Sequence, residues 1–352
     1  MSMYEILEET QQKQEINKEI TVDCIVLLVE SLHEYGKRSY DISLLGESMY
    51  NWVARACQSK PTLVSYSEED DLLTTIKPML KSGEYTLVLY SDTPLLTANG
   101  LRQIVEFAKN KNLSVCKLAR GWVLKTEYVK NAGAIYALNS YDVCNNEQFR
   151  VDSVDNIIKA INVLQNRINK YHMKNGVVLM NPSNTYIECG VTIDAGAVIE
   201  PFVSLKGTTS VGANSKICAN TVIEDSTIAT NSIIKAGGRV IRSAILDNAI
   251  VGNNCIISNK SVVGEEFIVS AGSILDGTTT MKNGKIGINC TLINTKLASG
   301  VTVGDYSKCL GSVAEDVKVG GGATIGTSCI VNAGVYIKGD YTLPNGKVAN
   351  KD

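Results

Sequence analysis

The stretch that decides the fold runs over residues 187–223 and reads IECGVTIDAGAVIEPFVSLKGTTSVGANSKICANTVI. Every sixth residue in it is branched and apolar, and most residues between are small or polar: Ile187, Ile193, Ile199, Leu205, Val211, Ile217 and Ile223. The spacing returns in two later runs, at 245–269 and 313–337. A six-residue period is not a helix period, and it is typical of a β-helix whose triangular coil consists of three hexapeptides, with the apolar residue pointing inward. We therefore predict an all-β, left-handed parallel β-helix over residues 177–352.

The first part of the chain has a different pattern. Residues 21–29 and 85–90 are apolar runs suited to buried parallel strands, and helical spacing of apolar residues occurs between and after them. Alternation of strands and helices predicts a doubly wound α/β sheet, here a shortened domain over residues 1–152. In such sheets a ligand site lies beyond the carboxyl ends of the strands, and Asp92 falls at one of these ends.

One long helix is expected between the two parts, over residues 153–176. Apolar residues recur in it at three- and four-residue spacing. Asp152 or Ser153 can cap its start, and Gly176 can end it. We expect this helix to link the two domains.

Composition excludes several classes of protein. The net charge of −2 gives no reason to expect nucleic acid as a partner. No apolar run reaches the length of about 18 residues that a membrane span needs, so we expect a cytoplasmic protein without one. The ten cysteines form no C-x-x-C pair, and Cys255, Cys290 and Cys329 follow repeat residues. We interpret these three as small buried residues rather than as disulfides or metal ligands.

The chain also resembles a known family over nearly its whole length. Residues 167–170, 172–173, 175–177 and 184–187 resemble the domain junction of the bifunctional N-acetylglucosamine-1-phosphate uridyltransferase / glucosamine-1-phosphate acetyltransferase family. Residues 44–53 and 85–96 resemble its nucleotidyltransferase domain, and residues 301–330 its last coils. The resemblance implies an N-terminal domain that uses UTP and magnesium. It also implies a trimeric β-helix that acetylates a sugar phosphate from acetyl-CoA.

The uridyltransferase motifs of that family are altered in this sequence. The family's glycine-rich phosphate loop has its counterpart at residues 30–38, which read ESLHEYGKR without the glycine spacing. Lys37 and Arg38 are candidates to contact a phosphate, but an ordinary solvated surface turn is the better explanation for them. The family's second glycine motif has no counterpart near residues 68–73, and its sugar-binding lobe is shortened.

A magnesium site is the part of this domain that the resemblance still supports. The family holds the ion between the strand-end Asp, matched by Asp92, and a residue before the linker helix, matched by Asp152. Two carboxylates suit a hard divalent cation. The alternative is that Asp92 caps the following turn and Asp152 caps the linker helix.

The acetyltransferase site is altered as well. The family's catalytic base is a histidine on the β-helix, and this sequence has no histidine after His172. Alignment of the coils places Asn254 at that position and Arg242 at that of a lysine that holds the sugar phosphate. Ordinary polar coil residues are the alternative for both. Residues 276–285 match the family's protruding loop in place and length only. His172 itself matches a junction histidine, and we expect it to be structural.

Two functions therefore follow from the sequence. The first is a transferase of sugar-nucleotide metabolism with weak or altered activity, which takes a sugar phosphate or a nucleotide sugar. The second is a catalytically degenerate scaffold or regulatory protein. The flat faces of a β-helix and the resemblance both favour a homotrimer.

Overall fold

The computed structural model describes residues 22–30, 38–57, 59–136, 139–140, 146–313 and 316–350. These residues form two compact units, Met1–Leu164 and Gln165–Asp352. The division falls inside helix α6 (Val154–Lys174), so each unit contains part of the predicted linker helix. Ser153 caps the helix through its Oγ, which accepts from Asn156 N at 3.3 Å. Gly176, with φ of +86°, ends it.

The first unit is a six-stranded sheet with helices on both faces. The strand order is β4-β1-β5-β7-β6-β8. The strands are β1 (Val22–Val29), β4 (Thr62–Tyr66), β5 (Tyr85–Tyr90), β6 (Val115–Leu118), β7 (Gly121–Lys125) and β8 (Asn139–Ser140). Strands β4, β1 and β5 run parallel, whereas β7 is antiparallel to both β5 and β6. The three parallel strands therefore end at one edge of the sheet.

Burial explains why β5 lies near the middle of the sheet. All six of its side chains are buried, as expected of a strand with both faces covered. Helices α2 (Met49–Ala56) and α4 (Ala98–Asn110) pack on one face, and α3 (Leu72–Ile76) and α5 (Thr126–Asn131) on the other. The hairpin of β2 (Ser43–Leu44) and β3 (Glu47–Ser48) precedes α2, and short 3-10 turns occupy Ser39–Asp41, Lys77–Met79, Asn146–Gln148 and Pro182–Asn184. The predicted α/β class is confirmed.

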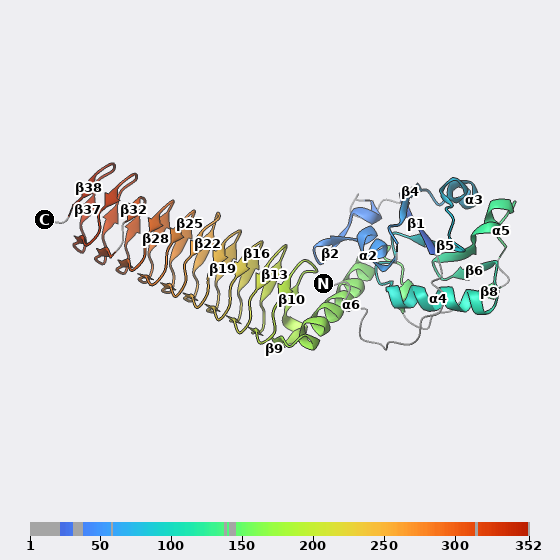
Figure 1. Ribbon diagram of the computed structural model, residues 1–352, viewed down its shortest axis with the longest axis horizontal. Helices are drawn as coiled ribbons and strands as arrows, with labels where there is room; N and C mark the ends of the chain where they lie inside the picture. Colours follow the sequence, from blue (N-terminus) through green and yellow to red (C-terminus); the bar gives the residue numbers. More distant parts are fainter. Residues whose placement is uncertain are drawn as a thin grey trace. The chain divides into compact units, whose positions relative to one another are not determined.

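The second unit is a parallel β-helix of three ten-stranded sheets, whose coils follow one another from β9 to β38 in Figure 1. The β9 sheet contains β9 (Val178–Leu179), β12 (Val198–Ile199), β15 (Lys216–Ile217), β18 (Ile233–Ile234), β21 (Ile250–Val251), β24 (Ile268–Val269), β27 (Lys285–Ile286), β30 (Thr302–Val303), β33 (Lys318–Val319) and β36 (Tyr336–Ile337). The β10 sheet contains β10 (Tyr186–Ile187), β13 (Ser204–Lys206), β16 (Val222–Glu224), β19 (Arg239–Ile241), β22 (Ile256–Ser258), β25 (Ile274–Asp276), β28 (Thr291–Ile293), β31 (Lys308–Cys309), β34 (Thr324–Ile325) and β37 (Thr342–Leu343). The β11 sheet contains β11 (Thr192–Ile193), β14 (Ser210–Val211), β17 (Thr227–Ile228), β20 (Ala244–Ile245), β23 (Val262–Val263), β26 (Thr279–Thr280), β29 (Lys296–Leu297), β32 (Ser312–Val313), β35 (Ile330–Val331) and β38 (Val348–Ala349).

The repeat residues fill the bore of the β-helix, as the six-residue spacing predicts. Each coil stacks its inward residue on the same position of the next, for example Ile187 on Leu205 and Leu205 on Ile223. The cysteines at 255, 290 and 329 are buried at the coil corners, so their interpretation as small core residues is confirmed. Hexapeptides therefore specify this part of the fold directly.

One expectation about the β-helix is wrong. Residues 276–285 resemble a protruding loop in the sequence, but the coil continues through them, with β26 and β27 paired to their neighbours. The reason is Thr280, which takes the inward position although it is polar. It is buried, and its hydroxyl accepts a hydrogen bond from Gly264 N at 2.9 Å. The inward positions are Leu275, Thr280 and Ile286, so one step shortened to five residues is followed by a full six-residue step, and there is no insertion.

Candidate functional site

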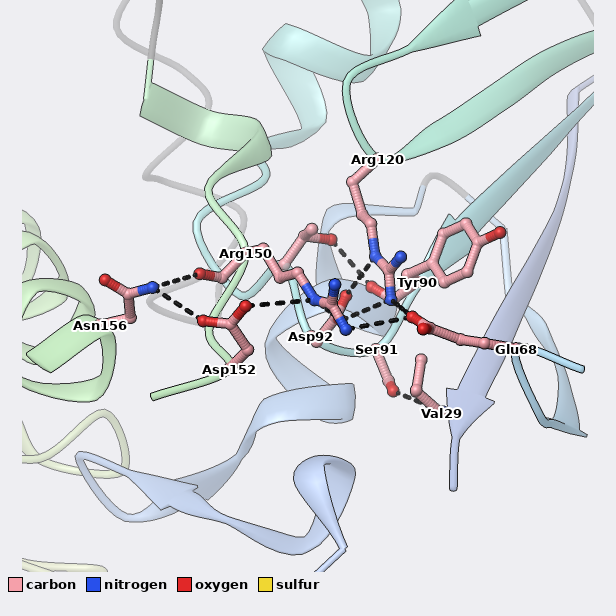
Figure 2. Close-up of polar contacts among 10 residues, drawn as sticks. Val29, Glu68, Tyr90, Ser91, Asp92, Arg120, Arg150, Asp152 and Asn156 are labelled. Atoms are coloured by element: carbon pink, nitrogen blue, oxygen red, sulfur yellow. Dashed lines mark hydrogen bonds and ion pairs between the residues drawn. The ribbon is translucent and has the colours of Figure 1, made fainter. Parts of the chain in front are cut away.

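The carboxyl edge of the parallel strands holds a cluster of five charged side chains, which we call the edge cluster: Glu68, Asp92, Arg120, Arg150 and Asp152. Figure 2 shows these side chains converging just beyond β5. Topology brings them together, because the chain passes this edge after β4, after β5, at the β6–β7 turn and before α6. This edge is the place where an open α/β sheet usually binds its ligand.

Asp92 lies at the centre of the edge cluster. Only 3% of its side chain is exposed. Arg120 donates from Nε to Oδ1 at 3.2 Å and from Nη2 to Oδ2 at 2.8 Å, so the pair is bidentate. The Nε of Arg150 forms an ion pair with the same Oδ2 at 3.2 Å. Both carboxylate oxygens of the buried aspartate therefore already face guanidinium groups.

Backbone contacts fix Asp92 in this position. Its carbonyl oxygen accepts from Val151 N at 2.8 Å, which ties the segment before α6 to the end of β5. The preceding residue, Ser91, accepts at Oγ from Val29 N at 3.1 Å, which joins the ends of β1 and β5. Hydrogen bonds of Ser91 and Asp92 thus tie the end of β5 both to β1 and to the segment before α6.

Arg120 is held from several sides. Its guanidinium carbon lies 4.0 Å from the centroid of the Tyr90 ring, within the range of a cation–π contact. Nη2 also donates to Glu68 Oε1 at 2.9 Å. Burial opposes the charge of Arg120, but its hydrogen bonds and ion pairs with Asp92 and Glu68 prevail, so the pKa of the guanidinium lies above its ordinary value. The hydrogen bond from Arg120 holds the pKa of Glu68 below its ordinary value.

Asp152 lies at the opposite side of Arg150 from Asp92, as Figure 2 shows. Its Oδ2 is 3.6 Å from Arg150 Nε, and its Oδ1 accepts from Asn156 Nδ2 at 2.9 Å. The structure therefore brings Asp92 and Asp152 to one place, as the sequence predicts, but with an arginine between them. Side chains that supply two positive charges do not fit a magnesium ion in this position. The magnesium site stays a prediction, and the edge cluster as it stands argues against it.

The predicted substrate-binding residues lie on the β-helix and are not brought together. Asn254 stands at the corner before β22, and Arg242 at the corner after the adjacent strand β19. Arg242 Nη2 reaches Asn259 Oδ1 at 3.5 Å. Because Asn259 lies five residues beyond Asn254 along an extended segment, the two corners are roughly 16 Å apart. Within one copy of the chain, Arg242 and Asn254 therefore stand at different corners of the β-helix.

Both residues have a structural explanation at these corners. Asn254 has φ of +55° and Arg242 has φ of +47°, the left-handed conformation in which Asn and Gly are common. The equivalent corners above and below Asn254 carry Gly237 and Gly272, and a Cβ at Gly237 would lie 2.1 Å from Asn254 Oδ1. The asparagine side chain therefore packs over its glycine neighbour. Their roles in substrate binding stay predictions.

Four further residues complete the comparison with the sequence. His172 is 1% exposed on α6, and neither ring nitrogen has a hydrogen-bond partner among the described residues. Burial lowers its pKa to about 4. This environment fits the structural role expected of it. His33 and Lys37 of the altered phosphate loop lie outside the described residues, whereas Arg38 donates from Nη1 to the Tyr40 hydroxyl at 2.6 Å.

Two kinds of feature are absent from the described residues. None of their helices is long and apolar enough to cross a membrane. No group of three or more His, Cys, Asp or Glu side chains within the described ranges is arranged to hold a metal ion.

Comparison with known proteins confirms the resemblance over part of the chain. The chain is 41% identical over 80 residues to the bifunctional protein GlmU of Pediococcus pentosaceus and 40% identical over 82 residues to that of Levilactobacillus brevis. This chain resembles GlmU. The matches cover 22% and 23% of the chain but only 17% of each relative, so the chain matches about a sixth of the length of these proteins. No family model matches the chain.

Solved structures add little to this resemblance. A UDP-N-acetylglucosamine acyltransferase from Campylobacter jejuni is 19% identical to the chain over 38% of its residues and 67% of the acyltransferase, with a TM-score of 0.24. A score this low supports no conclusion about activity.

Proposed function

We propose that the protein is a transferase of sugar-nucleotide metabolism that acts through its β-helix, with activity that is weak or altered relative to GlmU. Its substrate is a sugar phosphate or a nucleotide sugar, and its acyl donor is acetyl-CoA. The observation that carries the proposal is the stack of hexapeptide coils in a chain that is 41% identical to a GlmU protein over 80 residues. The bacterial relatives carry the word bifunctional in their names, and this proposal concerns one of the two reactions only.

The altered activity follows from the missing base. In acetyl transfer the amine nitrogen attacks the thioester carbon, the C–S bond breaks, and the amine proton passes by way of a base to the CoA thiolate. An imidazole suits this proton at neutral pH, whereas the Asn254 amide does not accept one. Loss of a general base alone typically lowers the rate by about 10²–10⁴-fold. We expect residual rather than efficient turnover.

Arg242 and Asn254 remain the proposed substrate-binding residues, and a second copy of the chain would complete their site. Each is exposed at a corner of the β-helix, Arg242 after strand β19 and Asn254 before the neighbouring strand β22 of the β10 sheet. A homotrimer that packs the β-helices side by side would place one corner of each copy near the other corner of its neighbour. The apolar side chains that β22 and β25 present to solvent, Ile256 and Ile274, support such packing.

The acetyl transfer can be tested by restoring the base. The full-length protein and its Asn254→His variant would be incubated with acetyl-CoA and glucosamine-1-phosphate, and acetylated sugar measured by mass spectrometry. Histidine is among the residues tolerated in the left-handed conformation, so the corner should be preserved. We expect turnover to rise at least tenfold in Asn254→His. Asn254→Gly, which keeps the corner but removes the amide, is the matched control and should lose the residual activity. No turnover in either the wild type or the histidine variant would refute the proposal.

A second function, a scaffold or regulatory protein without catalysis, is favoured by the edge cluster. Asp92, the aspartate that would hold magnesium, is neutralised by two arginines of its own domain. A thermal-shift panel of UTP with magnesium, UDP-N-acetylglucosamine with magnesium, and acetyl-CoA separates the two functions. A ligand at about 100 times its Kd adds about 2.7 kcal/mol to the folded state, enough for a clear shift in Tm. A shift with acetyl-CoA supports the transferase, and no shift across the panel supports the scaffold.

A further inference from the structure

The two aspartates predicted to hold magnesium share a different cation. Arg150 Nε lies 3.2 Å from Asp92 Oδ2 and 3.6 Å from Asp152 Oδ2, and its Nη2 lies 3.0 Å from Glu68 Oε1. Figure 2 shows the Arg150 side chain extended between Asp152 and the pair of Asp92 and Glu68. The Arg150 guanidinium group therefore contacts a carboxylate oxygen of each of three acidic residues, and a metal ion in this position would need such oxygens as ligands.

The charge balance of the edge cluster explains why no further cation is needed. Its two arginines face three carboxylates, so the cluster carries a net charge of −1 when all five groups are ionised. A divalent ion would reverse that charge beside the buried Asp92 carboxylate. It would also lie against two guanidinium groups, because Arg120 donates to Asp92 and Arg150 forms ion pairs with both Asp92 and Asp152. Magnesium binds carboxylate oxygens at about 2.1 Å and demands near-octahedral geometry, which these contacts do not leave room for.

We infer that the guanidinium group of Arg150 takes the place of a divalent cation between Asp92 and Asp152. The wild-type protein then holds no divalent cation at this edge of the sheet, and removing Arg150 uncovers a site that can bind one. Asp92 and Asp152 supply the oxygen ligands of that site, whereas Glu68 stays paired with Arg120.

Manganese is the probe that tests this inference, because its binding is followed directly by electron paramagnetic resonance of the free ion. Full-length wild type, Arg150→Met and Arg150→Lys would be titrated with Mn²⁺ in the absence of nucleotide. We expect no binding by wild type, one equivalent bound by Arg150→Met, and none by the double variant Arg150→Met/Asp92→Asn. Arg150→Lys retains a positive charge and should resemble the wild type. Failure of the folded Arg150→Met variant to bind Mn²⁺ would overturn the inference.

If Arg150→Met does not fold, the Mn²⁺ titrations of the wild type and of a second neutral variant still test the inference. Stoichiometric Mn²⁺ binding by wild type that is lost in Asp152→Asn, with the circular dichroism spectrum unchanged, would show that the metal and Arg150 coexist and would overturn the inference. Absence of binding in wild type, with binding in Arg150→Gln as a second neutral variant, would support it. Because the readout is metal binding in the first unit, its failure is distinct from failure of acetyl transfer by the β-helix.

Discussion

At the scale of single residues, His172 makes the stability of the protein depend on pH. The buried ring has a pKa of about 4, whereas histidine in an unfolded chain titrates near 6.5. Because the folded pKa is the lower of the two, the unfolded state gains its proton first as the pH falls. Stability is therefore complete above about pH 6.5 and declines between about pH 6.5 and pH 4. From about pH 7.5 to about pH 5 we expect a loss of about 2 kcal/mol from this residue, measured by urea unfolding.

His172→Leu is the control for that prediction. Other groups titrate over the same range, so the informative quantity is the difference in pH dependence between wild type and variant. The leucine variant should lose the part of the decline that belongs to the imidazole. Equal pH dependence in the two proteins would show that His172 is protonated or solvated in the folded state.

Arg242 provides a second prediction at this scale. Its φ of +47° places a long side chain in the left-handed conformation, which costs a residue other than Gly, Asn or Asp about 1 kcal/mol. Arg242→Asn should therefore raise the free energy of unfolding by roughly 0.5–1 kcal/mol, read as a higher Tm. Asn254→Ala places a residue that disfavours the left-handed conformation where asparagine now adopts it, so this variant should lower the free energy of unfolding by a similar amount. A lower Tm for Arg242→Asn would mean that the guanidinium contributes contacts beyond the one with Asn259.

The edge cluster shows how far residue-level prediction from sequence can reach. Asp92 was predictable, because a carboxylate directly after an apolar strand falls at the edge where parallel strands end. The arginines were not predicted. Arg150 stands only two positions before Asp152, and that proximity was the available signal that a cation already accompanies the predicted ligand. Arg120 reaches the site from the β6–β7 turn, and only the sheet order places that turn beside β5.

At the scale of structural elements, one coil of the β-helix depends on a matched pair of residues. Phe267 is completely buried at a corner where most coils carry smaller residues, and Gly284 lies opposite it in the next coil. A Cβ at Gly284 would lie 2.2 Å from Phe267 Cε2 and 2.7 Å from the Val301 carbonyl oxygen. Gly284→Ala should therefore destabilise the β-helix by about 2–3 kcal/mol, as overpacking of a core does. Thermal unfolding followed by circular dichroism measures the change.

Two variants make that prediction specific to the pair. In Phe267→Leu/Gly284→Ala the ring edge is removed, so part of the lost stability should return even though the Val301 oxygen stays in place. Gly133→Ala adds the same methyl group where no heavy atom lies within 4 Å, and it should change the Tm little. Equal effects of Gly284→Ala with and without Phe267 would refute the pairing.

The elements also show why a periodic sequence is predictable and its exceptions are not. The six-residue spacing specifies the coil because each apolar residue stacks on its copy in the next one. At Thr280 the inward residue is polar, and its hydroxyl accepts a hydrogen bond from Gly264 N. A hydrogen bond between coils has no signature in the sequence of one coil. For this reason the sequence suggested a loop at 276–285 where the structure has strands.

At the scale of the whole molecule, the proposed homotrimer makes a prediction that needs no ligand. Ile256 and Ile274 are paired neighbours in the β10 sheet, and each remains 38% exposed. A charged side chain buried in a contact between copies costs far more than one left in water. If this face packs against a second copy, Ile256→Lys/Ile274→Lys should convert the trimer to monomer without unfolding the coil. The mass in solution is read by light scattering coupled to size-exclusion chromatography, with circular dichroism as the test of folding.

Thr227→Lys, at an exposed position of the β11 sheet, is the matched control and should stay trimeric. A monomeric wild type would refute the trimer, and with it a substrate site that Arg242 and Asn254 complete from two copies.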